Sequence, residues 1–194
     1  MKKNKFTVLF SVTLFALLLF GCSEWAVDST NQGWTHFEAG DLDSAEYYFN
    51  DATLWDMTYA DAYNGLGWCY LLNDDLATSL SNFESALAYD FSLTDASAGA
   101  TLAATELGSH NDAISYADRV IDENSAYVFS HLSSVSIEDI RLAKAKSAAA
   151  LGDFEEALSE VQEIEPSFSA DPLTSEGQAA ILAKIEELIS SYGG

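Results

Sequence analysis

Residues 60–93 read ADAYNGLGWCYLLNDDLATSLSNFESALAYDFSL, and the pattern in this segment recurs through much of the chain. The segment is rich in alanine and leucine and contains no proline, a composition that favours helix. Asp74 and Asp75 stand near its middle, where the chain can leave one helix and an aspartate can cap the start of the next. We therefore predict a hairpin of two helices.

The hairpin pattern repeats at a constant step of 34 residues. The expected turns begin at Gly40, Asp74 and Gly108, and two large aromatic residues, Phe49 and Phe83, stand the same step apart. Small residues at equivalent positions of neighbouring hairpins allow two helices to approach closely, and the phenylalanines then fill the space between hairpins. One hairpin cannot bury its apolar face alone, so successive hairpins are expected to stack.

These residues and their spacing resemble the tetratricopeptide repeat family. The best match is residues 60–93, where the family's aromatic, leucine, glycine and alanine positions are occupied by Tyr63, Leu66, Gly67, Tyr70, Phe83 and Ala86. The resemblance implies an all-α fold, an α-solenoid of about four helical hairpins. The alternative is a generic alanine-rich helical bundle.

The boundaries of the units follow from the repeat. The solenoid is predicted over residues 31–191, with a first unit whose first helix looks shortened. The amphipathic spacing of Ile181, Ile185, Leu188 and Ile189 predicts a C-terminal capping helix. The expected units and the cap are residues 26–59, 60–93, 94–127, 137–168 and 173–191.

An insertion is expected before the fourth unit. The turn glycine of that unit, Gly152, lies 44 residues after Gly108 rather than 34, so about ten residues are added near residues 125–135. The inserted segment carries Tyr127, Phe129 and His131. Aromatic residues on a loop favour either a second contact site or packing against the core.

The N-terminus has the features of an export signal. Three lysines precede an apolar run, residues 6–20, that is short for a helix spanning a membrane. The run ends in Leu19-Phe20-Gly21-Cys22, which resembles the lipobox of bacterial lipoproteins. The resemblance implies that residues 1–21 are removed and that Cys22 is acylated. The alternatives are an ordinary signal peptide or an anchor with a chance cysteine.

The predicted lipid anchor places the chain in the bacterial cell envelope. We expect residues 22–30 to form a short tether to the membrane. Ser23 follows the cysteine, and in enteric bacteria a residue other than aspartate at this position usually accompanies sorting to the outer membrane. The sequence does not decide between the periplasmic and the surface side. The second cysteine, Cys69, lies between Trp68 and Tyr70 and is expected to be a small buried hydrophobic residue.

The charge of the chain is strongly acidic. It holds 31 acidic and 8 basic residues, a net charge of −23, and removal of the three N-terminal lysines makes the mature chain more acidic still. Such a surface repels phosphate backbones, so nucleic-acid binding is excluded. The acidity is consistent either with solubility in a salty environment or with a cationic partner or loosely bound divalent cations.

No catalytic or metal-binding motif is present in the sequence. The three histidines, His36, His110 and His131, are scattered without zinc-site spacing, and the acidic residues after Gly40 do not match a calcium-binding loop. There is also no phosphate-binding loop and no nucleophile elbow. We therefore predict a protein that is not an enzyme and that needs no cofactor or metal.

The family resemblance also suggests where a partner binds. In this family the first helix of each hairpin lines the concave face, which takes a peptide or a partner helix. Trp34 and Trp68 are one repeat apart and should be neighbours there, either as an exposed hot spot or as packing residues. The candidate partner-binding residues are Trp34, Phe37, Asp61, Asn64, Trp68, Leu71 and Leu102.

The sequence thus predicts a membrane-anchored adaptor that binds a protein or peptide partner in the cell envelope. The alternative is a lipoprotein whose tryptophan-lined face binds glycans or cell-wall fragments. The sequence does not identify the partner or the envelope process.

Overall fold

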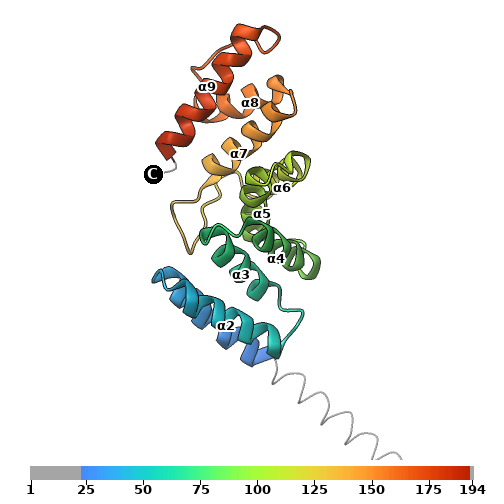
Figure 1. Ribbon diagram of the computed structural model, residues 1–194, viewed down its shortest axis with the longest axis vertical. Helices are drawn as coiled ribbons and strands as arrows, with labels where there is room; N and C mark the ends of the chain where they lie inside the picture. Colours follow the sequence, from blue (N-terminus) through green and yellow to red (C-terminus); the bar gives the residue numbers. More distant parts are fainter. Residues whose placement is uncertain (1–22, 193–194) are drawn as a thin grey trace, which may run out of the picture.

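The computed structural model describes residues 23–192, whose regular secondary structure is helical (Figure 1). An isolated antiparallel bridge joins Val128 to Ser136. A first helix covers residues 23–38. The others are α2 (Leu42–Trp55), α3 (Ala60–Leu72), α4 (Leu76–Tyr89), α5 (Thr94–Glu106), α6 (His110–Glu123), α7 (Ile137–Ala150), α8 (Phe154–Ile164) and α9 (Ser175–Tyr192).

The helices pair into four hairpins that stack along the long axis of the molecule, with α9 at the far end from the first helix (Figure 1). Within the first three hairpins, α2, α4 and α6 begin one repeat length apart, as the sequence predicts. The inner helices α3, α5 and α7 contact one another in turn, so each hairpin presents its first helix to the same side. The predicted all-α solenoid is confirmed.

The turns within the hairpins have the predicted chemistry. Gly40, Gly108 and Gly152 have positive φ angles, and Asp74 adopts the same conformation at the equivalent position. The carboxylate of the residue after the turn accepts the backbone N–H three residues later in three of the four hairpins, which satisfies a free helix donor. The caps are Asp41, Asp75 and Asp153.

Glycines set the spacing between hairpins. The ring of Phe83 is fully buried, and a Cβ added to Gly67 or Gly99 would lie 2.6 Å and 2.1 Å from it. Phe49 occupies the same place one repeat earlier, against Gly33 and Gly65. Each phenylalanine therefore sits between a glycine of its own hairpin and a glycine of the next hairpin, which lets the backbones approach closely. The predicted role of Phe49 and Phe83 is confirmed.

The first hairpin differs from the prediction. Residues 23–38 form one helix, so the expected tether at residues 22–30 is helical over the part that the structure describes, and the first helix is not shortened. Ala26 and Thr30 are buried, which shows that packing against the hairpin extends the helix toward the N-terminus. The predicted signal peptide and Cys22 lie outside the described residues. Within residues 23–192, no helix has the length and apolarity needed to cross a membrane.

The insertion and the capping helix are observed. Residues 124–136 join α6 to α7, whereas only residues 56–59 and 90–93 make the earlier connections. A capping box between Ser136 and Asp139 ends the inserted loop and starts α7. Ile181, Ile185 and Leu188 of α9 are buried against the last hairpin, as expected for a cap.

A charge cluster centred on the buried Lys144 joins the last two hairpins. The Nζ atom of Lys144 on α7 lies 2.7 Å from Asp118 of α6, and 2.5 Å and 2.8 Å from Glu156 and Glu160 of α8. Glu160 also pairs with Arg141 at 2.6 Å, and its side chain is 7% exposed. These pairs fix α6, α7 and α8 to one another where the insertion interrupts the regular stacking.

Candidate functional site

The inner face of the first two hairpins is covered by the inserted loop. Phe129 is fully buried, and its ring stacks on Trp68 at a centroid distance of 4.1 Å. The same ring contacts Trp34 edge to face at 5.9 Å. Trp34 is 5% exposed and Trp68 is fully buried. The chain therefore fills this part of its own concave face with an aromatic side chain.

Two polar contacts hold the loop on that face. The ring of His131 stacks on Trp34 at 4.0 Å, and its Nδ1 lies 2.7 Å from a carboxylate oxygen of Glu38. The hydroxyl of Tyr127 donates to Asp95 of α5 at 2.9 Å. Burial raises the pKa of the Asp95 carboxyl, and the hydrogen bond from Tyr127 opposes that rise.

The other predicted residues of this face belong to the same packed region. The indole N–H of Trp34 donates to one oxygen of Asp61 at 3.0 Å, and the side-chain amide of Asn64 donates to the other at 3.3 Å. Asn64 and Phe37 are buried, while Leu71 is half-buried and packs against the core. Asp61 therefore links the first two inner helices beneath the loop.

This arrangement corrects the hypothesis of an exposed Trp34/Trp68 hot spot. Both indole rings are packing residues, because the aromatic side chains of the loop replace water over them. The glycan alternative was based on the same tryptophan-lined face, and that face is not accessible. Of the two roles considered for the insertion, packing against the core is the one observed for Phe129.

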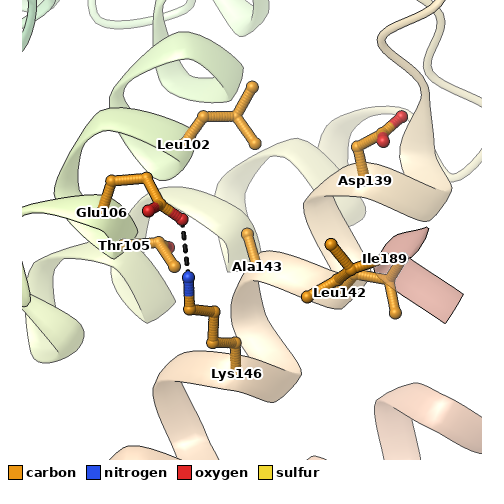
Figure 2. Close-up of a pocket in the computed structure, with 8 residues that line it drawn as sticks. All are labelled: Leu102, Thr105, Glu106, Asp139, Leu142, Ala143, Lys146 and Ile189. Carbon is orange, nitrogen blue, oxygen red and sulfur yellow. Dashed lines mark hydrogen bonds and ion pairs between the residues drawn. The ribbon is translucent and has the colours of Figure 1, made fainter. Parts of the chain in front are cut away.

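The concave face is open farther along the solenoid. A hollow of about 140 Å³ lies between α5 and α7, where Leu102, Thr105 and Glu106 face residues of α7 (Figure 2). Among the predicted partner-binding residues, Leu102 lines this hollow. Its remaining lining residues are Asp139, Leu142, Ala143, Lys146 and Ile189.

A second hollow of about 380 Å³ continues the first toward α9. Lys146 and Ile189 line both, and the second adds Leu182, Ile185, Glu186 and Ser190. We call the two together the α5–α7–α9 groove. Ile189 is 39% exposed and Leu182 is 45% exposed, so apolar surface remains accessible to a partner.

Charge is distributed unevenly in the groove. Lys146 is its one basic residue, and its Nζ lies 2.6 Å from Glu106 (Figure 2). Asp139 accepts hydrogen bonds from the backbone and hydroxyl of Ser136. Glu186, on the α9 side, forms no ion pair within residues 23–192. The groove is therefore an apolar strip with a net acidic rim.

Most of the groove was not predicted from the sequence. The amphipathic pattern predicts Ile189 on the packed face of the cap, whereas the other three apolar positions of α9 are more deeply buried. A fourth apolar position makes the apolar face of the helix broader than the packed interface needs, and this excess width is the feature of the sequence that could have indicated the groove.

Cys69 is buried as predicted, and burial, followed by the charge of Glu46, raises its pKa to about 12. Within residues 23–192, no group of three or more histidine, cysteine or acidic side chains could hold a metal ion.

Comparisons with known proteins give structural matches only. No protein-family model matches the sequence, and no curated protein matches it. Among solved structures, YrrB, described as a TPR protein with an unusual peptide-binding site, superposes with a TM-score of 0.66 at 20% identity, over 84% of this chain and 86% of that chain. The fold is that of the tetratricopeptide-repeat proteins.

Two other structures with this tetratricopeptide-repeat fold are similar. MamA gives a TM-score of 0.59 at 17% identity, over 85% of this chain and 81% of that chain. The first TPR domain of Spaghetti (RPAP3), bound to an HSP90 peptide, gives 0.54 at 20% identity, over 63% of this chain and 98% of that chain. In the tetratricopeptide-repeat solenoid of this protein, the open groove lies on the first helices of the third and fourth hairpins and on the cap.

Proposed function

We propose that this chain is a lipid-anchored adaptor of the bacterial cell envelope that binds a segment of a partner protein in the α5–α7–α9 groove. The observation that carries the proposal is the open apolar groove itself, on a concave face that is elsewhere covered by the chain's own loop. Two of the similar structures, YrrB and the Spaghetti domain, are described with a peptide-binding site or a bound peptide, which supports a peptide-like ligand here.

The groove specifies the chemistry of the partner segment. Leu102, Leu182 and Ile189 offer apolar contacts to one or two aliphatic or aromatic side chains. Glu186 and the overall acidity of the chain favour a basic residue next to them and disfavour an acidic one. The partner segment is therefore short, apolar at its centre and basic at its edge, consistent with a helix or an extended strand docking in a groove.

Photocrosslinking in living cells tests the location of the site. A photoreactive phenylalanine analogue at position 189 should capture one protein partner, and mass spectrometry should map the attachment to an apolar segment containing lysine or arginine. The same analogue at position 151 is the matched control, because Leu151 is 48% exposed in the turn before α8 and lies outside the groove. Equal capture from both positions would contradict the groove as the site.

The substitution Ile189→Asp tests the energetics. A charge in the middle of an apolar contact should weaken binding of the mapped segment, as a synthetic peptide, by about tenfold or more, which corresponds to about 1.4 kcal/mol. Isothermal titration calorimetry measures the affinity, and Leu151→Asp should leave it unchanged. An unaltered affinity in Ile189→Asp would exclude this groove as the binding site.

The envelope location rests on the N-terminal sequence and needs its own experiment. Cys22→Ser should abolish acylation and move the chain from the membrane fraction to the soluble or signal-retaining form, with Cys69→Ala as the control that keeps the anchor. Intact-mass spectrometry of the membrane-bound protein measures the lipid, and sucrose-gradient fractionation assigns the inner or the outer membrane. A wild-type chain without added lipid mass would disprove the lipoprotein assignment.

A further inference from the structure

Four large apolar side chains are exposed together at the N-terminal end of the solenoid. Trp25 of the first helix is 58% exposed, and Trp55 at the end of α2 is 43% exposed. Leu54 is 82% exposed and Met57 is 72% exposed, on either side of Trp55 in the sequence. We call these four residues the N-terminal aromatic patch. Figure 1 shows that the start of the first helix and the α2–α3 connection lie at the same end of the molecule.

The patch is held in a defined arrangement. The rings of Trp25 and Trp55 stack at a centroid distance of 5.7 Å with an interplanar angle of 28°. The indole N–H of Trp55 donates to Asp51 at 3.0 Å, and Asp51 also accepts the hydroxyl hydrogen of Ser29 at 2.6 Å. Two stacked tryptophans, one from each helix of the first hairpin, therefore form a preorganised apolar surface, and the exposed Leu54 and Met57 adjoin Trp55 in the sequence.

The position of the patch in the chain indicates what covers it. Trp25 follows Cys22 by three residues, so the two backbones are at most about 11 Å apart even in a fully extended chain. The apolar run of residues 6–20 ends just before them. Whether the chain is held by an acylated Cys22 or by the uncleaved run, Trp25 must lie at the level of the membrane surface.

We infer that the N-terminal aromatic patch docks onto the lipid bilayer to which the chain is anchored. Tryptophan favours the membrane–water interface, where its apolar ring contacts the acyl boundary and its N–H stays near polar groups. The inference rests on the membrane anchoring proposed above. The first helix begins directly after Cys22, so this helix and the docked patch together fix the orientation of the solenoid relative to the membrane.

Charge near the patch sets the lipid class and the depth. Glu24 and Asp28 are exposed beside Trp25, and no lysine or arginine occurs between Lys5 and Arg119. Asp56, next to Trp55, accepts hydrogen bonds from the backbone and hydroxyl of Thr58. The carboxylates keep the patch at the headgroup level and favour neutral, zwitterionic headgroups over anionic ones.

Tryptophan fluorescence of the full-length chain in vesicles tests the inference. Acrylamide should quench Trp25 and Trp55 about threefold less in phosphatidylcholine vesicles than in the soluble Cys22→Ser chain without detergent, because the rings leave water. Phosphatidylcholine brominated near the glycerol boundary should quench the same two rings. Trp34 and Trp68 are buried and provide a constant background. Vesicles rich in phosphatidylglycerol should show weaker protection.

Matched variants isolate the patch. Trp25→Phe/Trp55→Phe should remove the lipid-dependent signal. Adding Leu107→Trp to that variant places a reporter at a turn position with the same 43% exposure as Trp55, and its ring should stay accessible to acrylamide. Equal protection of position 107 would overturn the inference, because it would show that lipid contacts the protein surface in general and not the N-terminal aromatic patch in particular.

The failure of this inference and the failure of the anchoring proposal give different results. An acylated, membrane-bound chain whose Trp25 and Trp55 remain fully accessible to acrylamide overturns the docking and leaves the anchor intact. A chain without acylation whose patch is still protected supports the docking through the uncleaved N-terminal run. Protection that disappears only when a protein partner is removed would assign the patch to a protein and would also overturn the inference.

Discussion

The substitution Phe129→Ala is expected to lower the free energy of unfolding by about 3–5 kcal/mol, the usual cost of removing a fully buried phenylalanine ring. The ring is stacked on Trp68 and lies against Trp34, so its loss leaves a cavity beneath the loop. The emission of the tryptophans should shift to longer wavelength as water reaches Trp34 and Trp68. Urea denaturation followed by circular dichroism and by fluorescence measures both effects.

Val128 provides the control within the same loop. Its side chain is 54% exposed, and only its backbone is bridged to Ser136, so Val128→Ala should cost less than about 1 kcal/mol and leave the emission unchanged. A loss below 1 kcal/mol in Phe129→Ala would mean that the loop detaches readily. In that case the inner face of the first two hairpins would be an available binding surface, contrary to the packing described above.

Lys144→Ala is expected to destabilise the protein by about 2–3 kcal/mol, less than the usual cost of breaking a buried pair, because the buried Glu160 loses one of its two cationic partners but keeps the other. Without the ammonium group, the buried Glu160 keeps only Arg141 as an ion-pair partner. The negative charges of Asp118 and Glu156, which the ammonium group also neutralised, then repel one another and Glu160. The cluster links α6 to α8 through α7, so the last hairpin should loosen first. Hydrogen exchange of α8, alongside urea denaturation at pH 7, locates and measures the loss.

The charge state of Lys144 makes this experiment insensitive to pH near neutrality. Burial lowers the pKa of the ammonium group, but the hydrogen bonds to Asp118, Glu156 and Glu160 outweigh it and raise the pKa above the usual value of 10.5. A raised lysine pKa stabilises the fold fully below the unfolded-state value, and the stabilisation is lost only as pH rises through the higher folded-state value. The difference between wild type and variant should therefore be constant from pH 7 to about pH 9.

The neighbouring Lys146 is the matched control. It lies on the same helix two residues later and pairs with Glu106, but the two side chains are 42% and 56% exposed. Exposed pairs contribute about 0–1 kcal/mol, so Lys146→Ala should leave stability almost unchanged. Similar losses for the two lysines would show that burial of the Lys144 cluster has no energetic consequence.

The fold was predictable because its information is local and repeated. Helix propensity, the cap at Asp41 or Asp75, and a glycine facing each phenylalanine are properties of a few adjacent residues, and the 34-residue step copies them. The first helix was less predictable. Residues 23–30 carry weak helix signals of their own, and they become helical because Ala26 and Thr30 are buried against the hairpin.

The candidate site was only partly predictable. Helical spacing places Trp34, Trp68 and Leu102 on one inner face, and that placement is correct. Whether such a face is free depends on a loop about 60 residues away from Trp68, and residue spacing contains no information about where an irregular loop will lie.

The sequence by itself determined the number of hairpins, their register, the insertion and the capping helix, since each follows from short-range periodicity and turn chemistry. Only the tertiary structure decided which part of the concave face is open. Phe129 and His131 pack on the tryptophans of the first hairpins, whereas the space between α5, α7 and α9 is left to a partner. The physical reason is that an amphipathic stripe reports that a face is apolar, while its burial depends on contacts between residues distant in the chain.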